Sequence, residues 1–283
     1  MTSQLVDIHP HVISDDNIRY PKDPIGGVQS KWSLERPITW EQLEAAMNDV
    51  GVDKAAVVQA STTYGHDNSY LADSVDRSDG RITGVCSVSF LDDDSIDRIR
   101  YWIGDRGMSG VRLFTTGSTM SQAGWLDDER TRKCWSYVTD HGIPVCVQLT
   151  KEAIPQLRNI LDEYRGLQVT LDHVAMSNFT SGPPYSDARA ALELAEYEGV
   201  NLKVTSRVLT MAAKSEGGTA AALAELVDRF GSGRIAWGSN YPASEGSLPD
   251  LVAQLEQALK DLTPEDAANI RSGTAIRLYP KLA

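Results

Sequence analysis

Eight short apolar segments recur along the chain, and the stretches between them are long enough to hold helices. They occupy residues 4–9, 54–60, 82–90, 109–114, 143–149, 167–173, 200–206 and 234–239. Apolar strands that alternate with helices are typical of a parallel sheet whose faces are covered by helices. Eight such units in 283 residues predict an α/β fold, and specifically a (β/α)8 TIM barrel rather than an open doubly wound sheet.

The intervening stretches carry the spacing of amphipathic helices. The clearest is 39–51, where Thr39 is the expected N-cap, Gln42 stands at the capping-box position and Gly51 ends the pattern. No G-x-G-x-x-G motif follows an early strand, which disfavours a dinucleotide-binding fold. The same helical spacing recurs in residues 152–166 and 248–262.

No linker or repeat divides the chain, so we interpret residues 1–283 as one domain. The longest irregular stretch is 13–37, which leaves the first strand at the end where TIM barrels place their active sites. We expect it to be either a lid or a solvated surface loop. Its residues that could cover a bound anion are Tyr20, Lys22, Lys31, Trp32 and Arg36.

Composition and charge exclude several classes of partner. No apolar run reaches the roughly 20 residues of a membrane span, and the N-terminus lacks the pattern of a signal peptide. The net charge of -12 argues against nucleic acid and anionic membranes, whereas an anionic small substrate and a homo-oligomer stay open. Isolated cysteines at Cys86, Cys134 and Cys146 indicate reduced, buried thiols in a cytoplasmic protein, with a catalytic cysteine as the alternative.

Polar residues follow the predicted strands at their carboxyl ends. "DIHPH" after the first strand gives His9 and His11, and their spacing places both imidazoles on one side of the strand. "LDH" at the sixth strand adds His173. Three imidazoles at the mouth of one barrel indicate a catalytic or metal-binding site rather than isolated structural histidines.

Further polar residues at the strand ends are candidates for substrate binding. Arg112 and Lys203 lie inside apolar strands, where a charge must be paired or must project into a polar cavity. A buried ion pair with Asp7 or Asp172 is therefore the alternative for each. The full set of substrate-binding candidates is Gln59, Tyr64, His66, Arg112, Gln148, Lys203 and Arg207.

With "DIHPH", "LDH" and "WGSNYP" after strands one, six and eight, the chain resembles the amidohydrolase superfamily. The similarity is to its amidohydrolase-related (amidohydrolase 2) branch, which includes sugar lactonases and 2-pyrone-4,6-dicarboxylate lactonase, and it extends along the whole chain. The resemblance implies a distorted, amidohydrolase-like TIM barrel that hydrolyses a lactone or related ester at its C-terminal mouth. In metal-dependent relatives, the residues matching His9, His11 and His173 help to hold one divalent ion, and an aspartate matches Asn240. The resemblance also implies that the pyrone-dicarboxylate enzymes work without metal and grip a carboxylated ring with arginines and histidines.

Asn240 is the main departure from that pattern. An ionised aspartate can bind a cation and accept a proton, whereas asparagine offers a neutral carbonyl and is not a base near pH 7. The three imidazoles alone could still hold zinc with an open position. Without metal, one histidine would activate water, while Arg112 and Lys203 or Arg207 would stabilise the oxyanion and bind a substrate carboxylate. We favour the metal-free version, because the one carboxylate expected at the metal is missing; an amide engineered to trap substrate is a further alternative.

The sequence thus predicts a hydrolase of the metal-dependent-hydrolase family, EC 3.1.1 type, that opens a small carboxylated lactone ring in a catabolic pathway. Muconolactones, pyrones and aldonolactones are the expected kinds of substrate. Its expected catalytic residues are His9, His11, His173 and Asn240. The alternatives are a non-oxidative decarboxylase or hydratase of an aromatic-derived acid, and a catalytically silent ligand-binding homologue.

Overall fold

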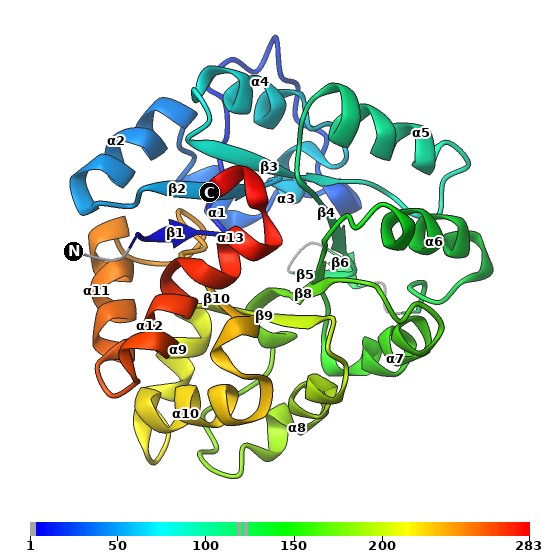
Figure 1. Ribbon diagram of the computed structural model, residues 1–283. Coiled ribbons are helices and arrows are strands. Elements are labelled where there is room, and N and C mark those ends of the chain that lie inside the picture. Colours follow the sequence, from blue (N-terminus) through cyan, green and yellow to red (C-terminus); the bar gives the residue numbers. More distant parts are fainter. Residues whose placement is uncertain (1–3, 118–119, 122–123) are drawn as a thin grey trace.

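The computed structural model describes residues 4–117, 120–121 and 124–283. Eight strands form one parallel sheet, in which each strand pairs with its neighbours in chain order. The ring is closed where Ile8 N–H donates to the Trp237 carbonyl at 3.2 Å and His11 N–H donates to the Tyr241 carbonyl at 2.8 Å. Helices surround this ring of strands (Figure 1). The predicted (β/α)8 TIM barrel is therefore confirmed.

The barrel strands are β1 (Val6–Asp7), β2 (Lys54–Val58), β3 (Ile82–Ser87), β4 (Gly110–Phe114), β7 (Val145–Gln148), β8 (Val169–Leu171), β9 (Val200–Thr205) and β10 (Ile235–Gly238). A separate antiparallel pair is formed by β5 (Thr116–Gly117) and β6 (Met120–Ser121). The helices are α1 (Lys31–Glu35), α2 (Trp40–Val50), α3 (Ser61–Tyr64), α4 (Ser69–Arg77), α5 (Ser95–Ile99), α6 (Arg132–Asp140), α7 (Ile154–Glu163), α8 (Arg189–Leu192), α9 (Ser206–Ala212), α10 (Gly218–Phe230), α11 (Leu248–Leu259), α12 (Pro264–Ala268) and α13 (Thr274–Leu278). No helix in these described ranges combines the length and apolarity needed to cross a bilayer.

All eight strands are present but shorter than their apolar segments. The first predicted strand, 4–9, is reduced to β1, because the Asp7 carboxylate takes the His9 N–H at 2.9 Å and Pro10 has no N–H to offer a neighbour. The sixth, 167–173, ends at Leu171, because the chain turns into the left-handed region with φ of 54° at His173 and 55° at Met176. These two strands therefore end just before His9, His11 and His173.

The predicted helix over 39–51 is observed as α2, with Thr39 accepting from the Gln42 N–H, Gln42 accepting in return, and Gly51 at φ 73°. The loop 13–37 is not structureless. It contains a 3-10 turn at Ile25–Gly27 and the short helix α1. These two elements hold the loop in a defined conformation beside the barrel mouth.

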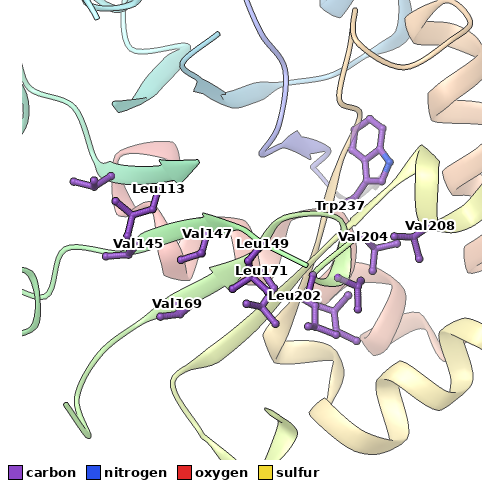
Figure 2. Packing of buried hydrophobic residues seen from close by; sticks show 14 of the residues in the cluster. Leu113, Val145, Val147, Leu149, Val169, Leu171, Leu202, Val204, Val208 and Trp237 are labelled. Atoms are coloured by element: carbon purple, nitrogen blue, oxygen red, sulfur yellow. The ribbon is translucent and has the colours of Figure 1, made fainter. Parts of the chain in front are cut away.

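Side chains along the strands alternate between two layers. Val145 and Val147 of β7 pack outward with the buried residues of the surrounding helices, and Figure 2 shows them beside equivalent residues of β8 and β9. Cys146, between them, faces the barrel interior and belongs to a smaller inner cluster that includes Tyr279 and Leu282 near the C-terminus. We call this inner cluster the plug of the barrel. The helix α13 leads into it and crosses the middle of the ring in Figure 1. The period of two along each strand thus separates the outer core from the barrel interior.

Candidate functional site

A cavity of about 240 Å³ lies among the carboxyl ends of the strands. Several predicted site residues line it, although they come from six different strands or the segments that follow them: His11, Arg112, Gln148, His173, Arg207 and Asn240. Trp32 of α1 also lines the cavity and stacks on the His11 ring, with ring centres 5.3 Å apart. Barrel closure therefore assembles most of the predicted constellation at one place.

The two cavity-lining histidines are neutral. His11 Nδ1 lies 2.8 Å from the Val58 carbonyl, which can only accept, so this nitrogen carries the proton and Nε2 keeps its lone pair. Burial, with the nearby charge of Arg112, lowers the pKa of His11 to about 3. Burial likewise lowers the pKa of His173 to about 4, and its Nδ1 lies 2.8 Å from Thr205 Oγ1. Both imidazoles are therefore unprotonated bases at neutral pH.

His9 lies beneath these two rings and is fully buried. Its ring centre is 4.9 Å from that of His11 and 5.0 Å from that of His173. A Cβ at Gly238 would come within 2.5 Å of His9 Cβ, so only glycine on β10 permits this approach. His9 Nδ1 lies 2.9 Å from Lys203 Nζ, whereas Nε2 is buried without a partner among the described residues. Burial and the Lys203 charge hold the pKa of His9 well below its usual range.

A buried ion network underlies the histidines. Asp172 Oδ1 lies 2.9 Å from Lys203 Nζ, and Asp172 Oδ2 lies 3.3 Å from Arg112 Nε. Burial opposes the charge on Asp172, but the Lys203 ammonium and the Arg112 guanidinium outweigh it and lower the pKa of that carboxyl. Asp172 in turn raises the pKa of Lys203 against the effect of burial. Arg112 and Lys203 are therefore both in buried ion pairs, which is the alternative interpretation of these strand cations. Of the two acids considered, Asp7 and Asp172, the partner is Asp172.

Arg112 belongs both to this network and to the cavity. Its guanidinium donates to the Gln59 carbonyl at 3.2 Å and to Gln148 Oε1 at 2.6 Å, besides the bond to Asp172. An arginine has five N–H donors, so donors remain for a ligand in the cavity that it lines. These three partners fix the plane of the guanidinium before any ligand arrives.

Asn240 stands at the mouth in the left-handed region, with φ 56°. Asparagine tolerates this conformation better than most residues other than glycine. Its Nδ2 donates to Ser244 Oγ at 3.1 Å, and its backbone carbonyl accepts from the Ser244 N–H at 2.7 Å. The side-chain amide is thereby oriented at the rim of the cavity.

Four of the substrate-binding candidates lie outside the lining of this cavity. Gln59 Nε2 donates to a backbone carbonyl at 2.5 Å, and the Tyr64 hydroxyl accepts from the Ser14 N–H at 2.8 Å. His66 lines a separate cavity of about 100 Å³ behind Phe114. Lys203 is buried below the floor rather than exposed to the cavity. The substrate contacts expected of these four residues remain predictions.

A larger cavity of about 640 Å³ adjoins the first and shares Arg207, Asn240 and Ala243 with it. The loop 13–37 borders this region. Arg36 donates to the Pro242 and Ala243 carbonyls at 3.1 and 3.0 Å, which ties the loop to the segment after β10. Tyr20, in contrast, donates to Asp73 at 2.6 Å. Of the five loop residues that could cover an anion, only Trp32 lines the smaller cavity.

The sequence indicates Asp172 only as a possible ion-pair partner, and Cys146 as a buried thiol with a catalytic cysteine as the alternative. An acid at the end of an apolar strand and directly before a candidate histidine is nevertheless a pattern that marks Asp172 as a candidate site residue. Cys146 Sγ lies 2.8 Å from Asp172 Oδ1. Burial and this carboxylate raise the pKa of Cys146 to about 12, so the thiol is protonated and is not a nucleophile.

Two sets of residues are candidates for holding a metal: the spatial cluster of His9, Cys146 and Asp172, and the set of His9, His11 and His173 that the sequence indicates. Ligand atoms of His9, Cys146 and Asp172 lie within 4.8 Å of one another. Lys203 Nζ, however, lies within hydrogen-bond distance of all three. In the set of three histidines, His9 Nδ1 accepts from that ammonium, so the neutral ring carries its proton on Nε2 and offers no lone pair there. The residues in this arrangement therefore do not fit a divalent cation.

The amidohydrolase family profile matches residues 6–281. The chain belongs to the amidohydrolase family. An L-fucono-1,5-lactonase of Burkholderia ambifaria is 25% identical in an alignment of length 252 that covers 84% of this chain and 84% of that protein. A Pseudomonas putida protein provisionally assigned as a 2-pyrone-4,6-dicarboxylic acid hydrolase superposes with a TM-score of 0.80 at 21% identity over all of both chains.

A zinc-bound amidohydrolase of Burkholderia multivorans has a TM-score of 0.77 and 18% identity, with 98% of this chain and 99% of that chain covered. At these identities, the two structural likenesses establish the fold, and both confirm the amidohydrolase-like barrel. The family and the lactonase relative support an enzyme of the hydrolase type.

Proposed function

We propose that this protein hydrolyses a small lactone that carries a carboxylate group. The observation that carries the proposal is the charge of the cavity. Arg112 and Arg207 line it, and no carboxylate does so among the described residues, although the chain has a net charge of -12. An excess of cationic donors in a protein that is acidic overall favours an anionic ligand.

The size of the cavity and the nature of the relative support the ester class. A volume of about 240 Å³ suits one small ring rather than a polymer. The Burkholderia ambifaria relative is named for a sugar lactone, L-fucono-1,5-lactone. L-Fucono-1,5-lactone carries no carboxylate, so the cavity charge is our reason for placing carboxylated rings ahead of it.

In this proposal, His11 is the general base. Water attacks the lactone carbonyl carbon and its proton passes to His11 Nε2, the nitrogen left free by the bond to the Val58 carbonyl. Arg207 and the Asn240 amide stabilise the oxyanion of the tetrahedral intermediate. The ring C–O bond then breaks, and the departing alkoxide takes the proton back from His11, which yields a hydroxy acid. Arg112 and Gln148 hold the substrate carboxylate and the ring.

A panel of lactones tests the proposal. Pyrone carboxylates, muconolactones and aldonolactones, including L-fucono-1,5-lactone, are supplied to the purified protein, and ring opening is followed by acid release and mass spectrometry. We expect turnover of at least one carboxylated ring, and a decrease in kcat of about tenfold or more in Arg207→Gln, equivalent to ~1.4 kcal/mol of transition-state stabilisation. Lys214→Gln is the matched control, because Lys214 is an exposed cation that lines only the larger cavity. Absence of turnover across the panel would contradict the proposal.

Decarboxylation is the second candidate. The described lining contains no carboxylate that could act as a base on water, and decarboxylation needs no hydrolytic water. Mass spectrometry of the same reactions separates the two outcomes. Hydrolysis adds the mass of water to the substrate, whereas decarboxylation removes the mass of CO₂. We propose the hydrolase first, because the lactonase relative matches over 84% of the chain.

A further inference from the structure

Lys203 is the most unusual residue in the barrel interior. It lies in the middle of β9, is fully buried, and pairs in register with Ala236 of β10. Its Nζ lies 2.9 Å from Asp172 Oδ1, 2.9 Å from His9 Nδ1 and 3.0 Å from Cys146 Sγ. These three partners are the residues whose ligand atoms cluster in the pattern of a metal site.

The chemistry of an ammonium group fixes the state of its neighbours. It has three N–H donors and no acceptor, so one donor is available for each of the three partners. His9 Nδ1 must then be an acceptor, and the neutral ring carries its proton on Nε2. In the competing arrangement, His9 Nδ1–H would donate to Asp172 Oδ1, but these two atoms are 3.4 Å apart. That N–H would also point at the Lys203 ammonium, so that two donors would face each other.

We propose that the Lys203 ammonium occupies the place that a divalent cation would take in this barrel and holds His9 as an Nε2–H donor beneath the bound substrate. Lys203 is thus a positioning residue that acts through His9. This role rests on the proposed lactone hydrolysis, because the Nε2–H would face a substrate or water oxygen. Nε2 is buried without a partner among the described residues, and the His9 ring adjoins His11 and His173, both of which line the cavity.

The same contacts explain how the chain tolerates a buried lysine. A fully buried ammonium is costly unless it is paired and its donors are satisfied. Asp172 supplies the counter-charge, and His9 and Cys146 accept the remaining bonds. An internal cation of this kind removes the lone pair that His9 would otherwise offer to a metal.

Histidine tautomers measured by NMR give the first test. The chain has five histidines, so a protein labelled with ¹⁵N in the imidazoles gives five ring patterns, and His9→Gln identifies the one from His9. We expect the Nε2–H tautomer for His9 in the wild type and a shift towards Nδ1–H in Lys203→Met. Lys214→Met, which removes an exposed cation, should leave the pattern unchanged. An Nδ1–H tautomer in the wild type would overturn the proposal.

Cobalt binding gives the second test and does not depend on activity. Titration of the wild type with Co²⁺ should give no absorption band from cobalt bound by imidazole or thiolate. Lys203→Ala frees His9, Cys146 and Asp172 and should gain one equivalent of bound Co²⁺. One equivalent bound by imidazole in the wild type would contradict the proposal, even if the variant fails to fold. If the tautomer and metal results hold but no lactone is opened, the proposed function fails while the role of Lys203 in fixing His9 stands.

Discussion

His11 combines a defined tautomer with a strongly lowered pKa. Its Nδ1 is bound to a backbone carbonyl, and burial lowers its pKa to about 3, against about 4 for His173. A base with this pKa stays unprotonated across the whole neutral and mildly acidic range. The ring is weaker as a base than an exposed imidazole, but it is always in the form that can accept a proton.

This state predicts an unusual pH profile. For the lactone opened by the wild type, kcat/KM should stay nearly constant from pH 7 to pH 5, because His11 is not yet protonated there. An acid limb near the ordinary imidazole pKa of ~6.5 would contradict the assignment of His11 as base.

Folding stability provides the control for this profile. In the unfolded chain, His11 and His173 bind protons below about pH 6.5, whereas the folded chain holds them neutral. Stability should therefore fall as pH drops from about 6.5 towards 4, and thermal unfolding at each pH shows where the protein is still folded.

Asn240→Asp tests what the amide does. The new carboxylate would stand beside Arg207 and the substrate, so under our proposal it repels an anionic ring. We expect KM for the carboxylated lactone to rise about tenfold, or ~1.4 kcal/mol, in steady-state kinetics. Ser244→Ala, which removes only the partner of the amide, should have a smaller effect. A large gain in turnover by Asn240→Asp would instead indicate a silent homologue that has lost its aspartate.

At the scale of elements, the loop 13–37 contributes one short helix to the site. The helix α1 is only 5 residues long, and it stacks Trp32 on His11 while Arg36 ties the next residues to the carbonyls after β10. Helices of this length are not stable by themselves, so these tertiary contacts hold it in place. Closure of this loop as a lid stays a prediction.

Trp32→Ala tests the contribution of α1. Loss of the stacked indole widens the cavity and frees the His11 ring, so KM should rise about fivefold, or ~1 kcal/mol, by steady-state kinetics. Leu34→Ala in the same helix is the control, because Leu34 is exposed and should leave KM unchanged. Equal effects of the two substitutions would show that α1 acts only through its general stability.

At the scale of the whole molecule, the site lies above a plugged barrel. Tyr279 and Leu282 fill the inner cluster at the amino ends of the strands, where a Cβ at Gly110 would lie only 3.1 Å from the Tyr279 ring. The polar layer of Cys146 and Lys203 adjoins this plug, and water is thereby excluded from beneath the ion network. The low dielectric that lowers the histidine pKa values thus depends on the C-terminal residues.

Tyr279→Ala should be among the most destabilising single changes in the chain. Removal of a fully buried aromatic side chain leaves a cavity and should lower the free energy of unfolding by about 3–5 kcal/mol, measured by denaturant titration. Lys281→Ala, two residues away and at the surface, should cost less than about 1 kcal/mol. A loss below about 1 kcal/mol for Tyr279→Ala would show that the plug is not needed for barrel stability.

The sequence by itself determined the barrel and the end of it that bears the site. Eight apolar segments with helical patterns between them have few other ways to bury their surfaces, so the fold follows from local periodicity. His9, His11, His173 and Asn240 could be found because they directly follow strands whose carboxyl ends meet at one mouth.

Only the tertiary structure decided which of these residues touch the cavity and in which state. Lys203 meets His9 across 194 residues of chain and Cys146 across 57, and such contacts depend on strand register and on barrel closure. Tyr64 and His66 follow β2 in α3 and the turn after it, and Lys203 lies deeper in the barrel than Arg112. No local pattern encodes these positions relative to the cavity. The tautomer of His9 and the neutrality of His11 arise from burial and from hydrogen-bond partners, and these exist only once the barrel has closed.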